Sequence, residues 1–400
     1  MNRTPLSRVE FIAMIALIMA TTAFSIDAML PALPEIAGAL SPTDPNRAQL
    51  VITSFVLGLG AGTLFTGPLS DAFGRKPVVV WGALLYTAGA LLAWHAPTLE
   101  LLLAARVTQG LGAAGARVVA IALIRDLYAG RGMARIMSFI MMVFTLVPAI
   151  APTLGAVIMG AFGWRQIFPA FVGFAIVSTG WLMLRQPETL APEARRPFRP
   201  ATLRTAAKEV LSHPTVLRSM IAQTLCFGML FGMLSSTQPL FDDTYGRGDQ
   251  FPMWFGGIAL VAATGSMLNA RLVMRMGMRA LVRAMLSVQI ALSSIMALAV
   301  LLGLPASVEF PIFVVWTTSV FFQMSLTVGN LNALAMEPMG HIAGLAASVI
   351  SAVSTVGAVM IAAPLGLAFN GTPLPLALGI ASLAAGALWV THGITRDNGA

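Results

Sequence analysis

Charge is what this sequence has least of. Only 10% of its 400 residues are Asp, Glu, Lys or Arg, whereas soluble domains carry about 25%. Hydrophobic residues make up 57% of the chain, and its mean hydropathy is +0.84. So few charges cannot cover the surface of a water-soluble protein of this length, and the sequence therefore predicts an integral membrane protein.

Reactive side chains are also scarce. The one cysteine, Cys226, lies in an apolar run, which excludes a disulfide framework. The four histidines lie far apart, and the sequence contains no H-x3-H pair, G-x-S-x-G element or P-loop. The two lysines, Lys76 and Lys208, lie in predicted loops, which excludes a buried Schiff base. We therefore expect no enzymatic activity, no cofactor and no metal site.

Apolar runs of about 20 residues, the length that crosses a bilayer, recur along the whole chain. A proline-rich, basic stretch at 186–213, with room for one amphipathic helix, separates them into two groups of six. We expect an all-α fold with a six-helix bundle at 1–185, a cytoplasmic linker at 186–213 and a second six-helix bundle at 214–400. The predicted spans are 9–38, 47–69, 77–95, 98–128, 132–161, 164–185, 214–241, 251–275, 280–303, 309–335, 342–370 and 373–393.

The basic residues set the predicted orientation. With both termini cytoplasmic, 19 of the 24 Lys and Arg residues fall on the cytoplasmic side, and only Arg47, Arg165 and Arg247 fall outside. This asymmetry is the positive-inside pattern of multi-pass proteins. The net charge of +8 is therefore explained by topology, and we expect lipid rather than nucleic acid as the partner of this basic chain.

Short sequence matches between the two halves indicate an internal duplication. Gly67-x3-Asp71 has a counterpart in Gly265-x3-Asn269. The segment Thr-Leu-Gly-Ala-Val at 153–157 has a counterpart in Thr-Val-Gly-Ala-Val at 355–359. Both pairs lie about 200 residues apart, in corresponding spans. Duplicated transporter halves place a substrate site where the repeats meet, near the bilayer midplane.

The loop between the second and third predicted spans carries the most specific motif. It reads Gly67-Pro-Leu-Ser-Asp71-Ala-Phe-Gly74-Arg75-Lys76-Pro77 and resembles the signature loop of the major facilitator superfamily at every defined position. The resemblance implies a conformational-switch cluster of Gly67, Asp71, Gly74, Arg75 and Lys76. Arg125 and Asp126, at the end of the fourth span, are the expected partners.

Further elements resemble the drug:H+ antiporters with twelve spans, and among them the Bcr/CflA subgroup. Arg106-Val-Thr-Gln109-Gly110 is similar to an R-x-x-Q-G element, and Asp27-Ala-Met-Leu-Pro-Ala-Leu-Pro34 to a D-x-Y-L-P-A-x-P stretch. Pro148, Pro152 and Gly155 resemble the antiporter motif of the fifth span. The resemblance implies a monomeric multidrug exporter of the bacterial inner membrane that moves small molecules against protons.

Three ionisable residues stand out inside the predicted spans, where a charge costs several kcal/mol. Counting about 1.5 Å per residue, Asp27 and Arg106 reach similar depths in the outer half of the membrane, where they can pair. Asp27 is the candidate for reversible protonation, with a permanent ion pair or direct substrate contact as alternatives. Arg117 shares a helix face with Arg106. It either meets an anionic substrate or extends toward the cytoplasmic end.

The C-terminal half has no comparable buried charge. Its polar and aromatic residues are candidates for a substrate cavity, although hydrogen bonds between helices explain each one equally well. These candidates are Gln223, Phe227, Phe231, Gln238, Trp316, Gln323 and Asn330. In the first half, Gly58-x3-Gly62 predicts close helix packing.

The leading hypothesis is a secondary active transporter that exports small amphipathic molecules by proton antiport and alternating access. The alternative is a dedicated exporter or importer of one metabolite, which is favoured if Arg117 selects an anion. A receptor of the same fold, which binds a ligand without moving it, stays open at this point.

Overall fold

A computed structural model describes residues 6–128 and 130–394, without the side chains at 130–132, 134–135, 138 and 141–145. Every regular element in that part of the chain is helical. Ten stretches are long and apolar enough to cross a membrane, and one of them, Ala306–Leu367, contains two α-helices. Helix is the expected form because, within hydrocarbon, it satisfies its own backbone hydrogen bonds. Both chain ends, predicted to be cytoplasmic, lie outside the described residues.

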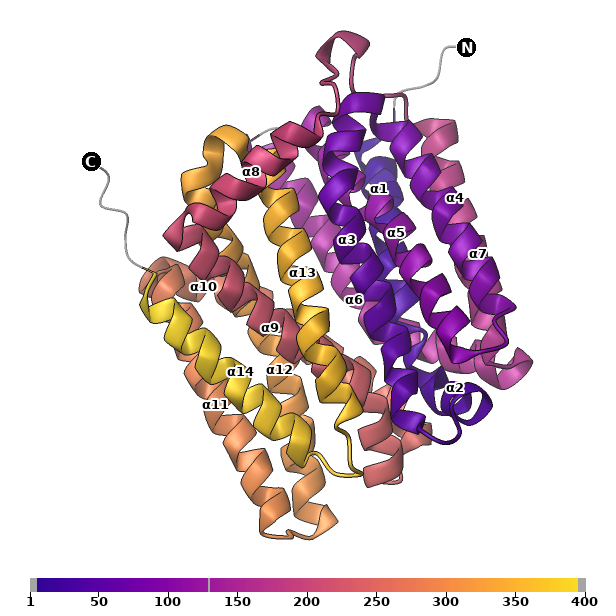
Figure 1. Ribbon diagram of the computed structural model, residues 1–400, viewed down its shortest axis with the longest axis vertical. Coiled ribbons are helices and arrows are strands. Elements are labelled where there is room, and N and C mark those ends of the chain that lie inside the picture. Colours follow the sequence, from indigo (N-terminus) through magenta and orange to yellow (C-terminus); the bar gives the residue numbers. More distant parts are fainter. Residues whose placement is uncertain (1–5, 129, 395–400) are drawn as a thin grey trace. The chain divides into compact units, whose positions relative to one another are not determined.

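The chain divides into two compact units, and the first comprises Met1–Thr43 and Ser54–Pro200. Its helices are labelled in Figure 1. They are α1 (Arg8–Asp27), α2 (Leu33–Leu40), most of α3 (Leu50–Phe73), α4 (Arg75–Trp94), α5 (Leu99–Leu127), α6 (Gly130–Phe162) and α7 (Ile167–Arg185), with short 3-10 turns η1 (Leu30–Ala32), η3 (Trp164–Gln166) and η4 (Pro192–Ala194).

The second unit comprises Asp44–Thr53 and Ala201–Ala400. Its long helices alternate with short turns (Figure 1). They are α8 (Pro200–Ser212), α9 (Pro214–Pro239), α10 (Phe251–Met276), α11 (Met278–Leu301), α12 (Ala306–Met336), α13 (Ala343–Leu367) and α14 (Leu374–His392), with the short helical turns η2 (Pro45–Gln49), η5 (Leu240–Thr244), η6 (Gly248–Gln250) and η7 (Glu337–Ile342).

The boundary between the units differs from the predicted division. The break in the linker falls at Pro200, and α8 is the amphipathic helix expected there, with Ala206 and Val210 buried. The η2 turn belongs to the second unit because its side chains bond to that unit. Asn46 Nδ2 donates to the carbonyl of Phe369 at 2.7 Å, and Ser236 Oγ donates to Gln49 Oε1 at 3.0 Å.

The first predicted span, 9–38, is wrong as one continuous helix. α1 ends at Asp27, a 3-10 turn follows at Leu30–Ala32, and α2 runs from Leu33. Pro31 and Pro34 lack the N–H that would continue the α-helical ladder. The break leaves Asp27 at the end of a helix, deep inside the first unit, rather than in the middle of one.

Glycines bring α3 and α5 into direct backbone contact, as the Gly58-x3-Gly62 spacing predicted. A Cβ at Gly58 would overlap the carbonyl oxygen of Val107, and one at Gly62 would lie 2.8 Å from that of Leu111. From the other side, a Cβ at Gly110 would overlap the carbonyl oxygen of Phe55. The contact is therefore reciprocal, and neither helix can carry a side chain at these positions without moving.

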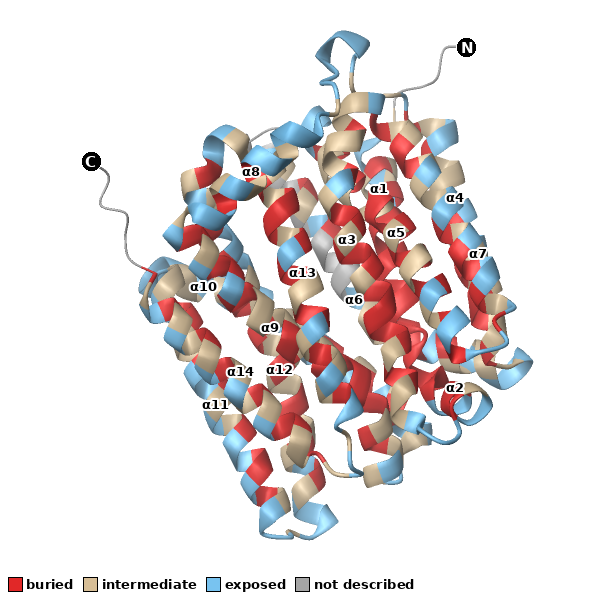
Figure 2. Ribbon diagram, viewed as in Figure 1, coloured by how far each residue is buried: buried red, intermediate tan, exposed pale blue. Residues whose placement is uncertain are grey.

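Large apolar side chains on the outside of each unit indicate the lipid-facing surfaces. On α4, Leu84 and Leu92 are 63% and 61% exposed, and on α14 Trp389 is 79% exposed. Figure 2 shows such exposed positions along the sides of α4 and α11. A protein in water rarely exposes so much contiguous apolar surface, which agrees with a multi-pass membrane protein.

Substitution at the α3–α5 contact tests this packing. Gly58→Ala is expected to destabilise the protein by about 1–3 kcal/mol, because the added methyl group meets backbone that cannot rotate away. Gly173→Ala on α7, where no atom lies within 4 Å of the new Cβ, is the matched control and is expected to be neutral or stabilising. Thermal unfolding in detergent measures both, and equal Tm values for the two variants would contradict the contact.

Candidate functional site

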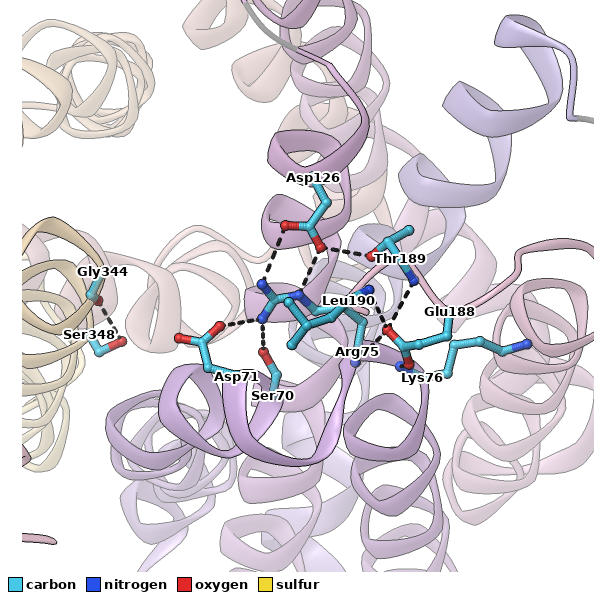
Figure 3. Close-up of polar contacts among 10 residues, drawn as sticks. All are labelled: Ser70, Asp71, Arg75, Lys76, Asp126, Glu188, Thr189, Leu190, Gly344 and Ser348. Atoms are coloured by element: carbon cyan, nitrogen blue, oxygen red, sulfur yellow. Dashed lines mark hydrogen bonds and ion pairs between the residues drawn. The ribbon is translucent and has the colours of Figure 1, made fainter. Parts of the chain in front are cut away.

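Arg75 is the centre of a charge cluster at the start of α4. Its guanidinium Nε donates to Asp126 Oδ2 at 2.9 Å, and Nη1 donates to Asp71 Oδ1 at 2.5 Å and to Ser70 Oγ at 2.7 Å. Figure 3 shows these carboxylates on either side of the guanidinium. Arg75 is only 7% exposed, whereas the Asp71 side chain is 51% exposed and that of Asp126 20%, so the guanidinium is buried and its carboxylate partners reach water. The expected contact between Arg75 and Asp126 is confirmed.

Glycine makes this geometry possible. Gly74 turns the chain between α3 and α4 with φ of 101°, in the region that side chains avoid. Gly67 lies one turn of α3 ahead of Asp71, and Lys76 Nζ donates to the carbonyl of Met183. Arg125 is exposed and has no contact with the cluster among the described side chains, so of the predicted Arg-Asp pair only the aspartate takes part.

The linker completes the cluster with a carboxylate that sequence reasoning missed. Glu188 Oε1 accepts from the backbone N–H of Arg75 at 3.0 Å, and Oε2 accepts from that of Lys76 at 2.9 Å. Glu188 therefore caps the first turn of α4, where N–H groups have no partner within the helix. Burial raises the pKa of Glu188, but N–H donors from Leu190, Lys76, Arg75 and Thr189 outweigh it and hold the pKa below the ordinary 4.5.

A second linker residue ties the same cluster to α5. Thr189 Oγ1 donates to Asp126 Oδ2 at 2.7 Å (Figure 3), and the backbone N–H of Arg196 donates to the carbonyl of Asp71. The linker carries no apolar periodicity, so only its Pro-Glu-Thr sequence could have marked these residues. The result is that residues 188–196 belong to the first unit as part of its polar cluster.

Arg106 lies in a closed polar pocket of the first unit and is 0% exposed. Its Nη1 donates to Gln109 Oε1 at 2.6 Å, and its Nη2 donates to the carbonyl of Ser25 at 2.8 Å. The guanidinium also lies 4.5 Å from the centre of the Phe55 ring, a favourable cation–π contact. Ser25 Oγ in turn bonds to the hydroxyl of Tyr86 at 2.5 Å.

The predicted pairing of Asp27 with Arg106 is not formed. Asp27 is 5% exposed, yet its carboxylate has neither an ion pair nor a hydrogen bond within residues 6–128 and 130–394. A similar depth in the membrane does not by itself bring the two side chains together. The guanidinium donors point to Ser25 and Gln109 instead, and α1 ends at Asp27 before the chain turns away.

The antiporter motif abuts the turn that follows Asp27. Pro148 and Pro152 lie inside α6, and Gly155 follows within one turn. A Cβ at Gly155 would overlap the carbonyl oxygen of Ala28. The glycine therefore lets α6 touch the backbone next to the buried carboxylate.

Arg117 lies in α5, eleven positions after Arg106, and is half-buried. Unlike Arg106, it has no hydrogen bond and no ion pair in the described part of the chain. A guanidinium without a partner in an apolar span is rare, and it is a functional candidate for that reason.

On α9, three of the predicted cavity residues share one face. Gln223, Phe227 and Phe231 follow one another at intervals of four, and the two rings stack with centroids 5.8 Å apart. The side-chain oxygen of Gln223 is buried and has no partner among the described atoms. Gln238 instead donates to Asp242, one turn further along.

The candidates on α12 form hydrogen bonds within the second unit. Trp316 Nε1 donates to Ser293 Oγ at 2.9 Å, and Asn330 Nδ2 donates to Asn269 Oδ1 at 2.8 Å. Gln323, 0% exposed, accepts from the hydroxyl of Thr327. The alternative of hydrogen bonding between helices therefore accounts for Trp316 and Asn330, whereas the hydrogen bonds of Gln323 lie within α12 itself.

Known proteins resemble the chain along most of its length. It is 31% identical over 358 residues to the bicyclomycin resistance protein homolog of Haemophilus influenzae, which covers 88% of this chain and 87% of that protein. It is 30% identical over 338 residues to a chloramphenicol resistance protein of Pseudomonas aeruginosa, covering 81% and 75%.

A solved structure and a family model agree with this similarity. The crystal structure of a D-xylose–proton symporter superposes with a TM-score of 0.75 at 14% identity, covering 97% of this chain and 99% of that one. The family model of the Major Facilitator Superfamily matches residues 14–363. With the signature cluster around Arg75 formed as well, the chain belongs to the major facilitator superfamily and is a multi-pass membrane transporter rather than an enzyme.

Proposed function

We propose that the chain exports small amphipathic drugs or metabolites across the bacterial inner membrane in exchange for protons, by alternating access of its two units. Two relatives are named for resistance to bicyclomycin and to chloramphenicol, which supports efflux. The observation that carries proton coupling is the carboxylate of Asp27, which is buried without a cation partner among the described residues.

Asp27 is the proton carrier in this proposal. A buried carboxylate without a partner is costly as an anion, and binding a proton removes its charge. Ala28, the next residue, touches α6 at Gly155, so a change of charge at Asp27 acts on a helix that carries the antiporter motif. Arg106 holds the end of α1 through the Ser25 carbonyl and positions this carboxylate.

Asp27→Asn is expected to abolish substrate-driven proton movement, because the amide cannot release a proton, while substrate binding persists. Proteoliposomes with a lumenal pH dye and an imposed pH gradient measure the flux. Glu35→Gln, at an exposed carboxylate of α2, is the matched control and is expected to transport normally. Proton flux that survives in the Asp27 variant would refute the assignment and leave the transporter otherwise intact.

Selectivity for one anionic metabolite is the second candidate function, and Arg117 is the observation that favours it. Arg117→Gln is then expected to lower the transport of anionic amphiphiles about tenfold or more, the value of one charged hydrogen bond, and to leave cationic ones unchanged. A radiolabelled panel of matched anionic, neutral and cationic compounds makes the measurement. Equal losses for all three classes would assign Arg117 a structural role.

In the same proposal, the cluster around Arg75 is a lock that forms in one state of the cycle and opens in another. Glu188→Gln replaces a charged cap of α4 with a neutral one. It is expected to lower the free energy of unfolding by about 0.5–2 kcal/mol and to alter the transport rate. Glu193→Gln, exposed in the same linker, is the control and is expected to leave the Tm unchanged.

The effect of Glu188 has a defined pH dependence. Its pKa is lowered in the folded protein, so its stabilisation is complete above the ordinary value and is lost as the pH falls through the lowered one. The difference in Tm between wild type and Glu188→Gln is therefore expected at neutral pH and to shrink below about pH 4.5. A difference that grows on acidification would contradict the charged cap.

A further inference from the structure

The second unit contains a cavity of about 750 Å³ outside every site described above. It lies between the α10–α11 turn and the end of α12, elements labelled in Figure 1. The lining residues that matter here are Met276, Met278, Arg279, Arg283, Leu334 and Glu337. This end of the unit is the one that the distribution of arginines predicts to be cytoplasmic.

Cationic groups predominate in the cavity. Arg283 Nη2 donates to the carbonyl of Thr391 at 2.9 Å, while its Nε is buried and has no partner in the described structure. Arg279 lines the same wall, one turn earlier on α11. Glu337 is exposed on the opposite side and forms no ion pair with Arg283 within residues 130–394. The Nε of Arg283, left without a partner by the described residues, faces a lining with two guanidinium groups and one carboxylate, which favours an anionic ligand.

The start of α4 is the corresponding position in the first unit, and it indicates what kind of group binds at the start of α11. Gly74 and Gly277 both turn the chain with positive φ, 101° and 79°, and each precedes the first residue of a helix. In the first unit, the carboxylate of Glu188 caps α4 there. In the second unit, no described side chain accepts from the N–H of Met278 at the start of α11, and the cavity opens at that point.

The surroundings of the cavity match the headgroup region of a membrane. Met274 and Met276, on the last turn of α10, are 84% and 45% exposed and present apolar surface beside the arginines. Arg271 and Arg275 add two more positive charges along the same helix end. Basic pockets at the cytoplasmic ends of membrane helices attract the anionic lipids of that leaflet.

We propose that the cavity between the α10–α11 turn and the end of α12 binds the phosphate group of an anionic phospholipid, with Arg279 and Arg283 as its ligands. The phosphate takes the place that Glu188 fills in the first unit. Its acyl chains lie along the exposed methionines of α10. A soluble phosphate ester has the same headgroup chemistry, and only the apolar contact distinguishes the lipid from it.

Thermal unfolding of the purified full-length protein in nonionic detergent tests the proposal, because a ligand that binds the native state raises the Tm once its concentration exceeds its Kd. The titrants are short-chain phosphatidylglycerol, short-chain phosphatidylcholine and glycerol 3-phosphate. Phosphatidylglycerol is expected to raise the Tm at the lowest concentration. Equal effects of the two lipids would overturn the anion site. Glycerol 3-phosphate acting at the same concentration as phosphatidylglycerol would overturn the lipid as its source.

Three variants assign the effect to this cavity. Arg283→Gln is expected to raise about tenfold the concentration of phosphatidylglycerol that gives a fixed increase in Tm, and Arg204→Gln, exposed on α8, is expected to leave it unchanged. Glu337→Gln is expected to lower that concentration, because it removes the one negative charge of the cavity, and a poorly folded variant cannot mimic tighter binding. Identical curves for Arg283→Gln and Arg204→Gln, or weaker binding by Glu337→Gln, would refute the site.

Discussion

The cost of placing a charge in hydrocarbon governs the polar architecture of this protein. Arg106 is tolerated at full burial because a carbonyl, an amide oxygen and an aromatic face surround its guanidinium. Arg75 is tolerated near the membrane surface because two carboxylates neutralise it. Against this background, Asp27 and Arg117 stand out, since both are ionisable and neither has a polar partner among the described residues. Groups that the fold leaves unsatisfied are the ones that ligands or protons can satisfy.

The lengths of the apolar runs predicted most helices closely. A membrane helix must be apolar where it crosses the hydrocarbon, so the ends of an apolar run lie close to the ends of its helix. The run at 98–128 became α5, Leu99–Leu127, and the run at 251–275 became α10, Phe251–Met276. The first span is present as Arg8–Leu40, but the break within it was missed because hydropathy does not register a change in backbone hydrogen bonding at Pro31 and Pro34. Composition predicted the apolar environment, whereas proline decided whether the helix continued.

The site was predictable where chemistry is concentrated in one motif and unpredictable where it depends on helix rotation. The signature loop identified Asp71 and Arg75, and the end of the fourth span identified Asp126. Counting rise per residue placed Asp27 and Arg106 at one depth, but the direction of a guanidinium depends on the rotation of α5 against α1, which counting does not provide. Glu188 was missed because a linker without periodicity gives no sign that it folds back onto a helix end.

The polar contacts of residues 188–196 change how the linker is understood. It is commonly pictured as a tether that joins two independently folding halves, yet its first part completes the cluster of the first unit, and the unit boundary falls at Pro200. A gene split to express the halves as separate chains must therefore be cut after residue 200. A cut at the end of the last apolar helix of the first half would leave the start of α4 without its carboxylate. The first part of the connecting segment is therefore a structural part of the unit that precedes it.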